Sequence, residues 1–169
     1  MKQILVLVML SISVFGLSVG SKPSSVSISE KNGGLVAGGP WKSEMLRDKV
    51  YVLFYIDPDE KSVNEHFSKA LKEQEYDHSL FGSMAIVNLG ATWKPNFVIE
   101  KILKSKQKEF PDTIYAKDKN KILVDAWDVE DDASNILIFA KDGTLLFYKS
   151  GKMQDADMRQ AFSIIKSNL

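Results

Sequence analysis

Continuous apolar runs alternate with amphipathic stretches along this chain, a pattern that predicts an α/β fold. The clearest run is Val50–Ile56, which is rich in β-branched and aromatic residues and too short for a typical helix, so it predicts a buried strand. Asp57-Pro58-Asp59 ends this strand, because proline cannot donate to a sheet ladder. Apolar residues then recur at helical spacing, so a helix is expected over about 61–75. A buried strand that leads into a helix N-terminus is a common place for chemistry in α/β proteins.

The rest of the chain continues the alternation of strands and helices. Further strands are expected at 83–89, 113–116, 136–140 and 144–149, and further helices at 96–109, 122–127 and 156–167. Asp142-Gly143 separates the last two strands and is a strong hairpin signal. The order predicts a central mixed sheet, mostly parallel, with helices on both faces and a C-terminal β-hairpin plus helix.

The N-terminal segment has the pattern of a secretory signal peptide. Lys2 precedes an apolar stretch over 4–19, and Ser18-Val19-Gly20 offers small residues at a cleavage site. An uncleaved membrane anchor is the alternative. We therefore expect a signal peptide at 1–20, a single domain at 21–169, and a periplasmic or secreted location. Within that domain, residues 21–40 read as an N-terminal extension or hairpin.

The amino-acid composition of the chain argues against several classes of function. Lys and Arg together number 22 and so do Asp and Glu, so no basic excess favours binding to nucleic acid, and no membrane contact is expected after signal cleavage. The chain has no cysteine, which excludes thiol chemistry, including thiol-disulfide exchange and peroxiredoxin activity.

The order of elements resembles the thioredoxin-like fold. VYVLFYIDPDEKS resembles the strand that runs into the redox motif of thioredoxins, and DASNILIFAKDGTLLFYKSG resembles their later strand, Asp-Gly turn and final strand. The resemblance places Asp59 and Ser62 where the two redox cysteines would lie, and Ala133 or Ser134 where a cis-proline would lie. Both functional signatures of a redoxin are thus missing.

A closer resemblance is to the YtfJ family, small exported bacterial proteins of thioredoxin-like fold. The matching segments are KVYVLFYI, AIVN and YAKDKNKILVDAWDVEDDASNILIFAKDGTLLFYKSG. In the last of these a tryptophan, an acidic loop and a small-residue pair precede ILIF and KDG. The resemblance implies a fold and a cysteine-free chain, and it implies no biochemical activity.

Charged and aromatic residues offer few candidates for chemistry. Asp57, Asp59 and Glu60 suit a helix N-terminus, where the helix dipole favours carboxylates, and general acid or base work is the alternative. A carboxylate cluster lies in and just before the acidic loop 128–135 and fits no EF-hand spacing; it consists of Asp125, Asp128, Glu130, Asp131 and Asp132. Neither histidine lies at metal-ligand spacing, so no metal or cofactor is expected. Trp93, in the loop ATWKP, is the best candidate for an exposed aromatic contact.

These observations favour a protein that acts by binding. The expected surface recognises a peptide, a protein or a small ligand and consists of Asp57, Asp59, Ser62, Trp127, Ala133 and Ser134. One competing hypothesis is a thiol-independent enzyme that uses the carboxylates of the same junction. Another is a structural or assembly protein in which the junction is vestigial.

Overall fold

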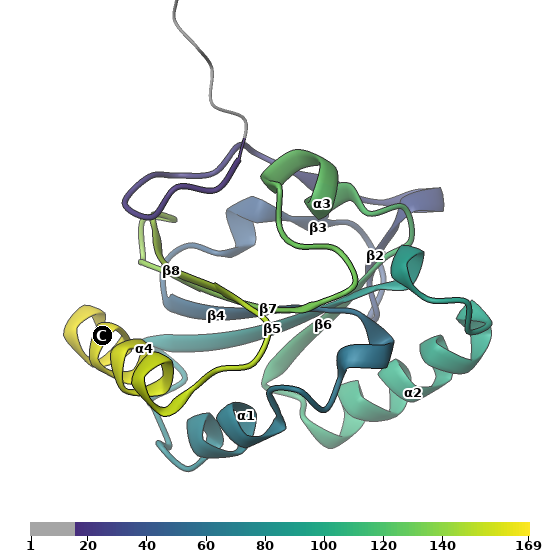
Figure 1. The fold of residues 1–169 in the computed structure, drawn as a ribbon. Helices are drawn as coiled ribbons and strands as arrows, with labels where there is room; N and C mark the ends of the chain where they lie inside the picture. The colour runs from purple at the N-terminus through teal and green to yellow at the C-terminus, as the bar shows by residue number, and fades with distance from the viewer. Residues whose placement is uncertain (1–15) are drawn as a thin grey trace, which may run out of the picture.

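The structure, a computed structural model, describes residues 16–169. Most of the predicted signal peptide lies outside these residues. Figure 1 shows a central sheet with α1, α2 and α4 on one face and α3 with β3 on the other. The α/β class with a mixed sheet covered on both faces is confirmed. The expectation that the sheet is mostly parallel is wrong, because three of its five strand pairings are antiparallel.

The sheet has six strands in the order β2-β6-β5-β4-β7-β8, and β1 pairs with β3 in a separate two-stranded sheet. The strands are β1 Ser27–Ile28, β2 Gly33–Leu35, β3 Trp41–Lys42, β4 Val50–Ile56, β5 Phe81–Asn88, β6 Thr113–Asp118, β7 Ser134–Phe139 and β8 Leu145–Ser150. The helices are α1 Glu65–Lys72, α2 Asn96–Glu109, α3 Ile122–Trp127 and α4 Asp155–Asn168. Short 3-10 turns occur at Glu30–Asn32, Ser43–Met45, Pro58–Glu60 and Leu89–Ala91.

Strand β4 lies in the middle of the sheet, as its continuous apolar run predicted. It pairs in parallel with β5 and antiparallel with β7, and its side chains from Val50 to Tyr55 are all buried. Successive side chains point to opposite faces, so β4 contributes to both cores. Phe54 packs toward Phe67 of α1 on one face, whereas Leu53 and Tyr55 pack in the core beneath α3 on the other.

Two expectations about local structure are wrong. Of the two interpretations of residues 21–40, the hairpin is wrong, because β2 pairs with β6 and β1 pairs with β3. The first long helix begins at Glu65 rather than near 61, because the 3-10 turn Pro58–Glu60 and the turn after it precede α1. The N-terminal segment therefore adds a strand, β2, to the central sheet rather than forming a hairpin of its own.

Residues 17–20, at the end of the predicted signal peptide, form hydrogen bonds with the domain. The Leu17 backbone N–H donates to the Trp127 carbonyl at 3.0 Å, and the Gly20 N–H donates to the Leu145 carbonyl at 2.8 Å. Cleavage after Gly20 would remove both contacts, whereas the hydrogen bond from Leu145 N–H to the Ser21 carbonyl, at 2.9 Å, would remain. Within residues 16–169, no helix combines the length and the apolar character needed to cross a bilayer.

The buried and exposed phenylalanines of the helical layer allow a matched test of the core. Phe67 is fully buried against Phe54 and Phe162, so Phe67→Ala should lower the free energy of unfolding by about 3–5 kcal/mol. Phe97 is exposed on α2, and Phe97→Ala should change it by no more than about 0.5 kcal/mol. Urea denaturation measures both, and equal losses would contradict the assignment of the core.

Candidate functional site

The junction between β4 and α1 begins with Asp57, a buried carboxylate. Its Oδ1 accepts a hydrogen bond from the Asp59 N–H at 2.8 Å, and its own N–H donates to the Ala133 carbonyl at 2.9 Å. Burial raises the pKa of Asp57 above its ordinary value, and the nearby carboxylates of Asp59 and Asp132 raise it further. Asp57 thus caps the turn Pro58–Glu60 and joins it to the start of β7.

Asn64, one turn further on, links three segments through one side chain. Its Nδ2 donates to Ser134 Oγ at 3.0 Å and to the Gly151 carbonyl at 2.9 Å. Its Oδ1 accepts a hydrogen bond from the Met153 N–H at 2.8 Å. Asn64 and Ser134 are both buried, so this set of contacts, the Asn64 clasp, fills the space next to the junction with satisfied polar groups.

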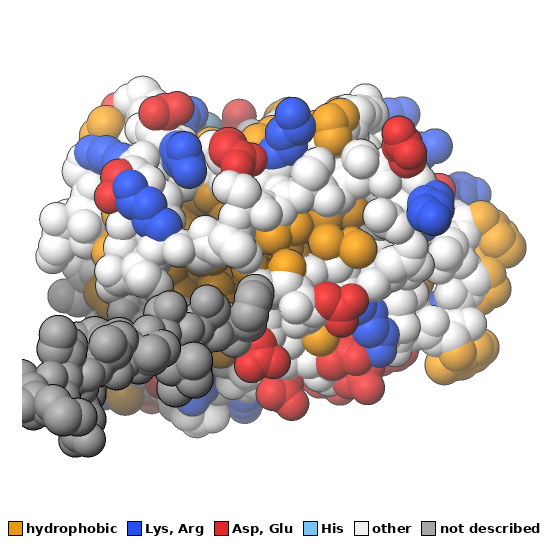
Figure 2. Space-filling view, turned by 90° about the horizontal axis from the view of Figure 1, so that it is seen from above, with side chains coloured by type: hydrophobic (Ala, Val, Ile, Leu, Met, Phe, Trp, Pro, Cys, Tyr) orange, Lys and Arg blue, Asp and Glu red, His pale blue; other side chains and the backbone are white. Residues whose placement is uncertain are grey.

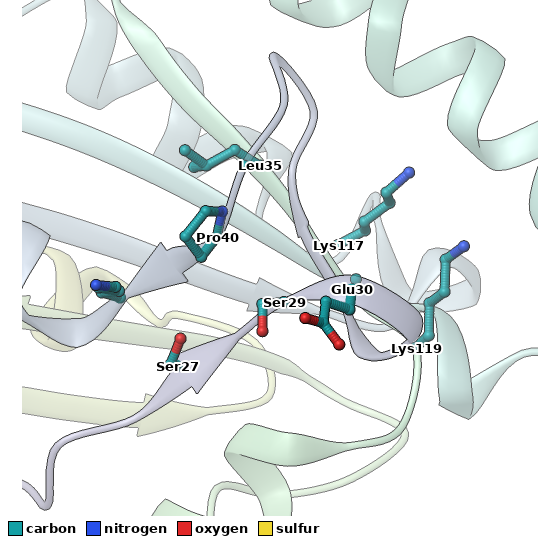
Figure 3. Close-up of a pocket in the computed structure, with 10 residues that line it drawn as sticks. Ser27, Ser29, Glu30, Leu35, Pro40, Lys117 and Lys119 are labelled. Carbon is teal, nitrogen blue, oxygen red and sulfur yellow. The ribbon is translucent and has the colours of Figure 1, made fainter.

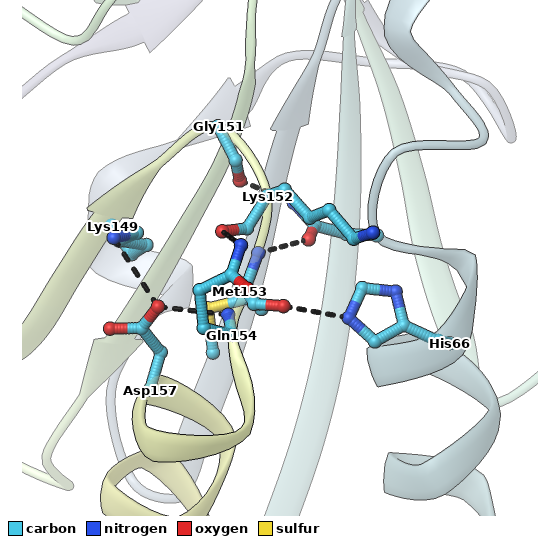
Figure 4. Close-up of polar contacts among 8 residues, drawn as sticks. His66, Lys149, Gly151, Lys152, Met153, Gln154 and Asp157 are labelled. Atoms are coloured by element: carbon cyan, nitrogen blue, oxygen red, sulfur yellow. Dashed lines mark hydrogen bonds and ion pairs between the residues drawn. The ribbon is translucent and has the colours of Figure 1, made fainter.

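A second set of contacts holds the turn between β8 and α4 against α1. A ring nitrogen of His66, Nε2, lies 2.8 Å from the Met153 carbonyl oxygen (Figure 4). The Gln154 N–H donates to an Asp157 carboxylate oxygen at 2.9 Å in a capping box, and Lys149 pairs with the same carboxylate at 3.3 Å. The backbone around Met153 is therefore fixed from both sides.

Asp59 and Ser62, which the sequence resemblance aligns with the redoxin cysteines, are both exposed at the junction. Asp59 accepts hydrogen bonds from the Lys94 ammonium group and from Thr92 Oγ1, the latter at 2.8 Å. These two donors hold the pKa of Asp59 below its ordinary value. Asp59 consequently connects the junction to the loop between β5 and α2.

Trp127 lies away from the surface that was expected to include it. Its indole is buried, its Nε1 donates to the Ser24 carbonyl at 2.9 Å, and its ring meets Trp41 edge-on at a centroid distance of 6.1 Å. It belongs to the core on the face of the sheet opposite α1. The structure brings Asp57, Ala133 and Ser134 together and leaves Trp127 on the far side.

The peptide geometry and the acidic loop add no reactive feature to the junction. No peptide bond in residues 16–169 is cis, so the backbone at Ala133 and Ser134 runs without the turn that a cis-proline makes. In the acidic loop, Asp131 accepts from Asn88 Nδ2 at 2.9 Å and pairs with Lys121. Across the described part of the chain, His, Asp and Glu form no group of three or more that could hold a metal ion.

Sequence reasoning missed a set of exposed apolar side chains on and just before α2. Trp93 is 86% exposed, Phe97 74%, Ile102 52% and Val98 41%, and we call these residues the α2 ledge. Val98, Ile99, Ile102 and Leu103 form the apolar stripe of α2, but only Ile99 and Leu103 are buried. In Figure 2 hydrophobic side chains project at the right-hand edge, the side on which α2 lies in Figure 1.

The signal for the ledge is an excess of apolar residues on α2. The buried stripe of α2 contains Ile99 and Leu103. The helix has three more apolar residues that this stripe does not bury, namely Phe97, Val98 and Ile102. Trp93 is the single residue of this surface whose exposure the sequence indicated.

A hollow of about 600 Å³ lies elsewhere, where the N-terminal segment crosses β6 (Figure 3). Lys117 and Lys119 line it, yet each ammonium group lies 3.0 Å from a Glu100 carboxylate oxygen on α2. In Figure 3 both side chains point away from Ser27 and Ser29, on the hollow's opposite wall. The charges of Lys117 and Lys119 are therefore directed away from the hollow and paired with Glu100, and we do not take the hollow as the functional site.

Fold and site together define a thioredoxin-like protein without the thiols of a redoxin. Similarity to solved structures agrees with this class, since a thiol-disulfide isomerase from Corynebacterium glutamicum superposes with a TM-score of 0.59 and 19% identity, over 84% of this chain and 92% of that one.

The chain belongs to the family described as "Bacterial protein of unknown function (YtfJ_HI0045)", which matches residues 19–168. The uncharacterized protein YtfJ of Escherichia coli K12 is 25% identical over 132 residues, 76% of this chain and 72% of its own length. An uncharacterized protein of Haemophilus influenzae is 26% identical over 150 residues, 83% of this chain and 81% of its own.

The Asn64 clasp predicts a matched pair of substitutions at the junction. Asn64→Ala would leave Met153 N–H, Ser134 Oγ and the Gly151 carbonyl without this partner, so it should lower the free energy of unfolding by about 2–4 kcal/mol. Ser62→Ala, on an exposed side chain of the same turn, should change it by no more than about 0.5 kcal/mol. Urea denaturation compares them, and a neutral Asn64→Ala would show that the clasp does not stabilise the fold.

Proposed function

We propose that this protein is exported and acts in the cell envelope by binding, without thiol redox chemistry. The observation that carries the proposal is the α2 ledge beside a junction that contains no cysteine. Contiguous exposed apolar side chains on a soluble domain commonly mark an interaction surface. The proposal therefore moves the binding surface from the junction itself to the loop and helix next to it.

The position of the ledge supports this role. Strands β4 and β5 are parallel neighbours, so the junction after β4 and the loop after β5 lie at the same edge of the sheet. Asp59 ties that loop down through Lys94 and Thr92 on either side of Trp93. A surface held in place before contact loses less conformational entropy on binding.

The carboxylate-enzyme alternative has weaker support. Asp57 has the raised pKa of a candidate acid or base, but it is buried and its Oδ1 already accepts from Asp59 N–H. Asp59 is exposed, but its carboxylate is engaged by Lys94 and Thr92. A substrate would have to displace these contacts before either group could transfer a proton.

The proposed function predicts that the protein shows no redox turnover. The purified protein should reduce insulin disulfides and consume peroxide no faster than a blank without protein, because the chain supplies no thiolate to attack either substrate. A thioredoxin assayed in parallel is the positive control. Turnover clearly above the blank, in protein free of contaminating thiols, would overturn the proposal.

Export is tested separately. The pattern Ser18-Val19-Gly20 predicts that protein recovered from outside the cytoplasm begins at Ser21, which intact-mass and N-terminal analysis would reveal. A matched variant, Gly20→Glu, should accumulate uncleaved, because cleavage requires a small residue there. Recovery of the full chain in the cytoplasm would contradict export.

A further inference from the structure

We propose that the α2 ledge docks on a membrane surface that carries anionic lipid headgroups. This inference rests on the proposed binding role and names the partner of the same surface. The ledge supplies apolar and aromatic groups for the bilayer interface, and lysines on the outer face of α2 supply the matching positive charge.

Three lysines project from α2 beside the ledge: Lys101, Lys104 and Lys108 are all exposed. Lys101 follows Phe97 by one helical turn, and Lys104 and Lys108 continue along the same side of the helix. Within residues 16–169 none of the three forms an ion pair with a carboxylate. Their charges are therefore available to a partner.

The acidic residues of α2 do not cancel this charge. Glu100 lies 3.0 Å from the ammonium groups of both Lys117 and Lys119, and Glu109 pairs with Lys106 at 2.9 Å. A zero sum of charges over the whole chain thus conceals a cationic, partly apolar face. The expectation of no membrane contact rested on that sum alone, and this proposal departs from it because of the arrangement of charges on α2.

This combination suits a lipid interface. Tryptophan and phenylalanine enter the boundary between headgroups and acyl chains, and lysine stems lie along apolar surface while their ammonium groups stay with the headgroups. Basic residues next to such side chains are attracted to anionic lipids. The ledge and the three lysines provide both contributions on one helix and its entry loop.

A second copy of the chain is a poorer occupant of the same surface. In a symmetric dimer the same patch meets itself, so Lys101, Lys104 and Lys108 of one copy would face those of the other. Juxtaposed like charges oppose association. An anionic surface has no such conflict.

Tryptophan fluorescence gives a direct test, because the chain carries its own probe. Of three tryptophans, Trp41 is 0% exposed and Trp127 1%, whereas Trp93 is 86% exposed. Residues 1–20 contain no tryptophan, so insertion of the N-terminal segment cannot by itself place an indole in the bilayer. Quenching by lipids brominated on their acyl chains therefore reports the position of Trp93.

The full chain is titrated with brominated vesicles of phosphatidylcholine alone or of equal parts phosphatidylcholine and phosphatidylglycerol. We expect quenching with the anionic vesicles and little with the neutral ones. Replacing Lys101, Lys104 and Lys108 together by glutamine should raise the lipid concentration for half-maximal quenching by about tenfold or more. Replacing the exposed lysines Lys31, Lys69 and Lys166 by glutamine makes the same change in net charge and should raise it much less.

Two further variants assign the signal. Trp93→Phe should remove the quenching while leaving the buried tryptophans unaffected, and Phe97→Ser should weaken binding without changing the charge. Absence of quenching would overturn the inference. Quenching of equal strength with neutral and anionic vesicles, and unchanged when the three lysines are replaced, would overturn it too. So would a Trp93 emission shift that depends on protein concentration alone or on an added acidic peptide alone. A negative vesicle result with no redox turnover removes only this inference, whereas redox turnover removes the proposed function.

Discussion

The side chain of Asn64 joins the start of α1, the first residue of β7 and the turn between β8 and α4. These segments are far apart in sequence, and the clasp brings them together beside the carboxyl end of the central strand β4. The contacts to Ser134 Oγ and Met153 N–H are buried and the one to the Gly151 carbonyl is partly buried. Breaking a buried one leaves a polar group without water to replace its partner. The hydrogen bonds of the Asn64 clasp thus fill the space beside the junction that the sequence resemblance aligns with the thiol site of a redoxin.

Because the junction is filled by these contacts, we place the binding surface beside it, on the loop after β5 and the first turns of α2. Asp59 remains exposed beside the clasp, but its carboxylate is used to hold Thr92 and Lys94 on either side of Trp93. The loop after β5 and the first turns of α2 then present apolar side chains that no described part of the chain covers. A rigid junction and an exposed neighbouring ledge together favour a binding role over a catalytic one.

The sequence was sufficient for the fold because its strongest signals are local. The continuous apolar run of β4, the Asp142-Gly143 turn and the α2 periodicity each specify an element without tertiary information. The candidate site was harder to predict from the sequence, because the partners of Asn64 are distant from it along the chain. Trp127 was placed on the wrong side of the sheet because a tryptophan fits a core and a binding surface equally well.

Amide hydrogen exchange at Met153 tests the central claim most directly, namely that the junction is locked rather than reactive. Its N–H lies outside the strands and helices and is bonded to Asn64 Oδ1. The account predicts that this amide exchanges as slowly as the amides of β4 and β7, because it is released only when the clasp opens with the rest of the fold. Exchange as fast as in an exposed loop, in an otherwise protected protein, would contradict it.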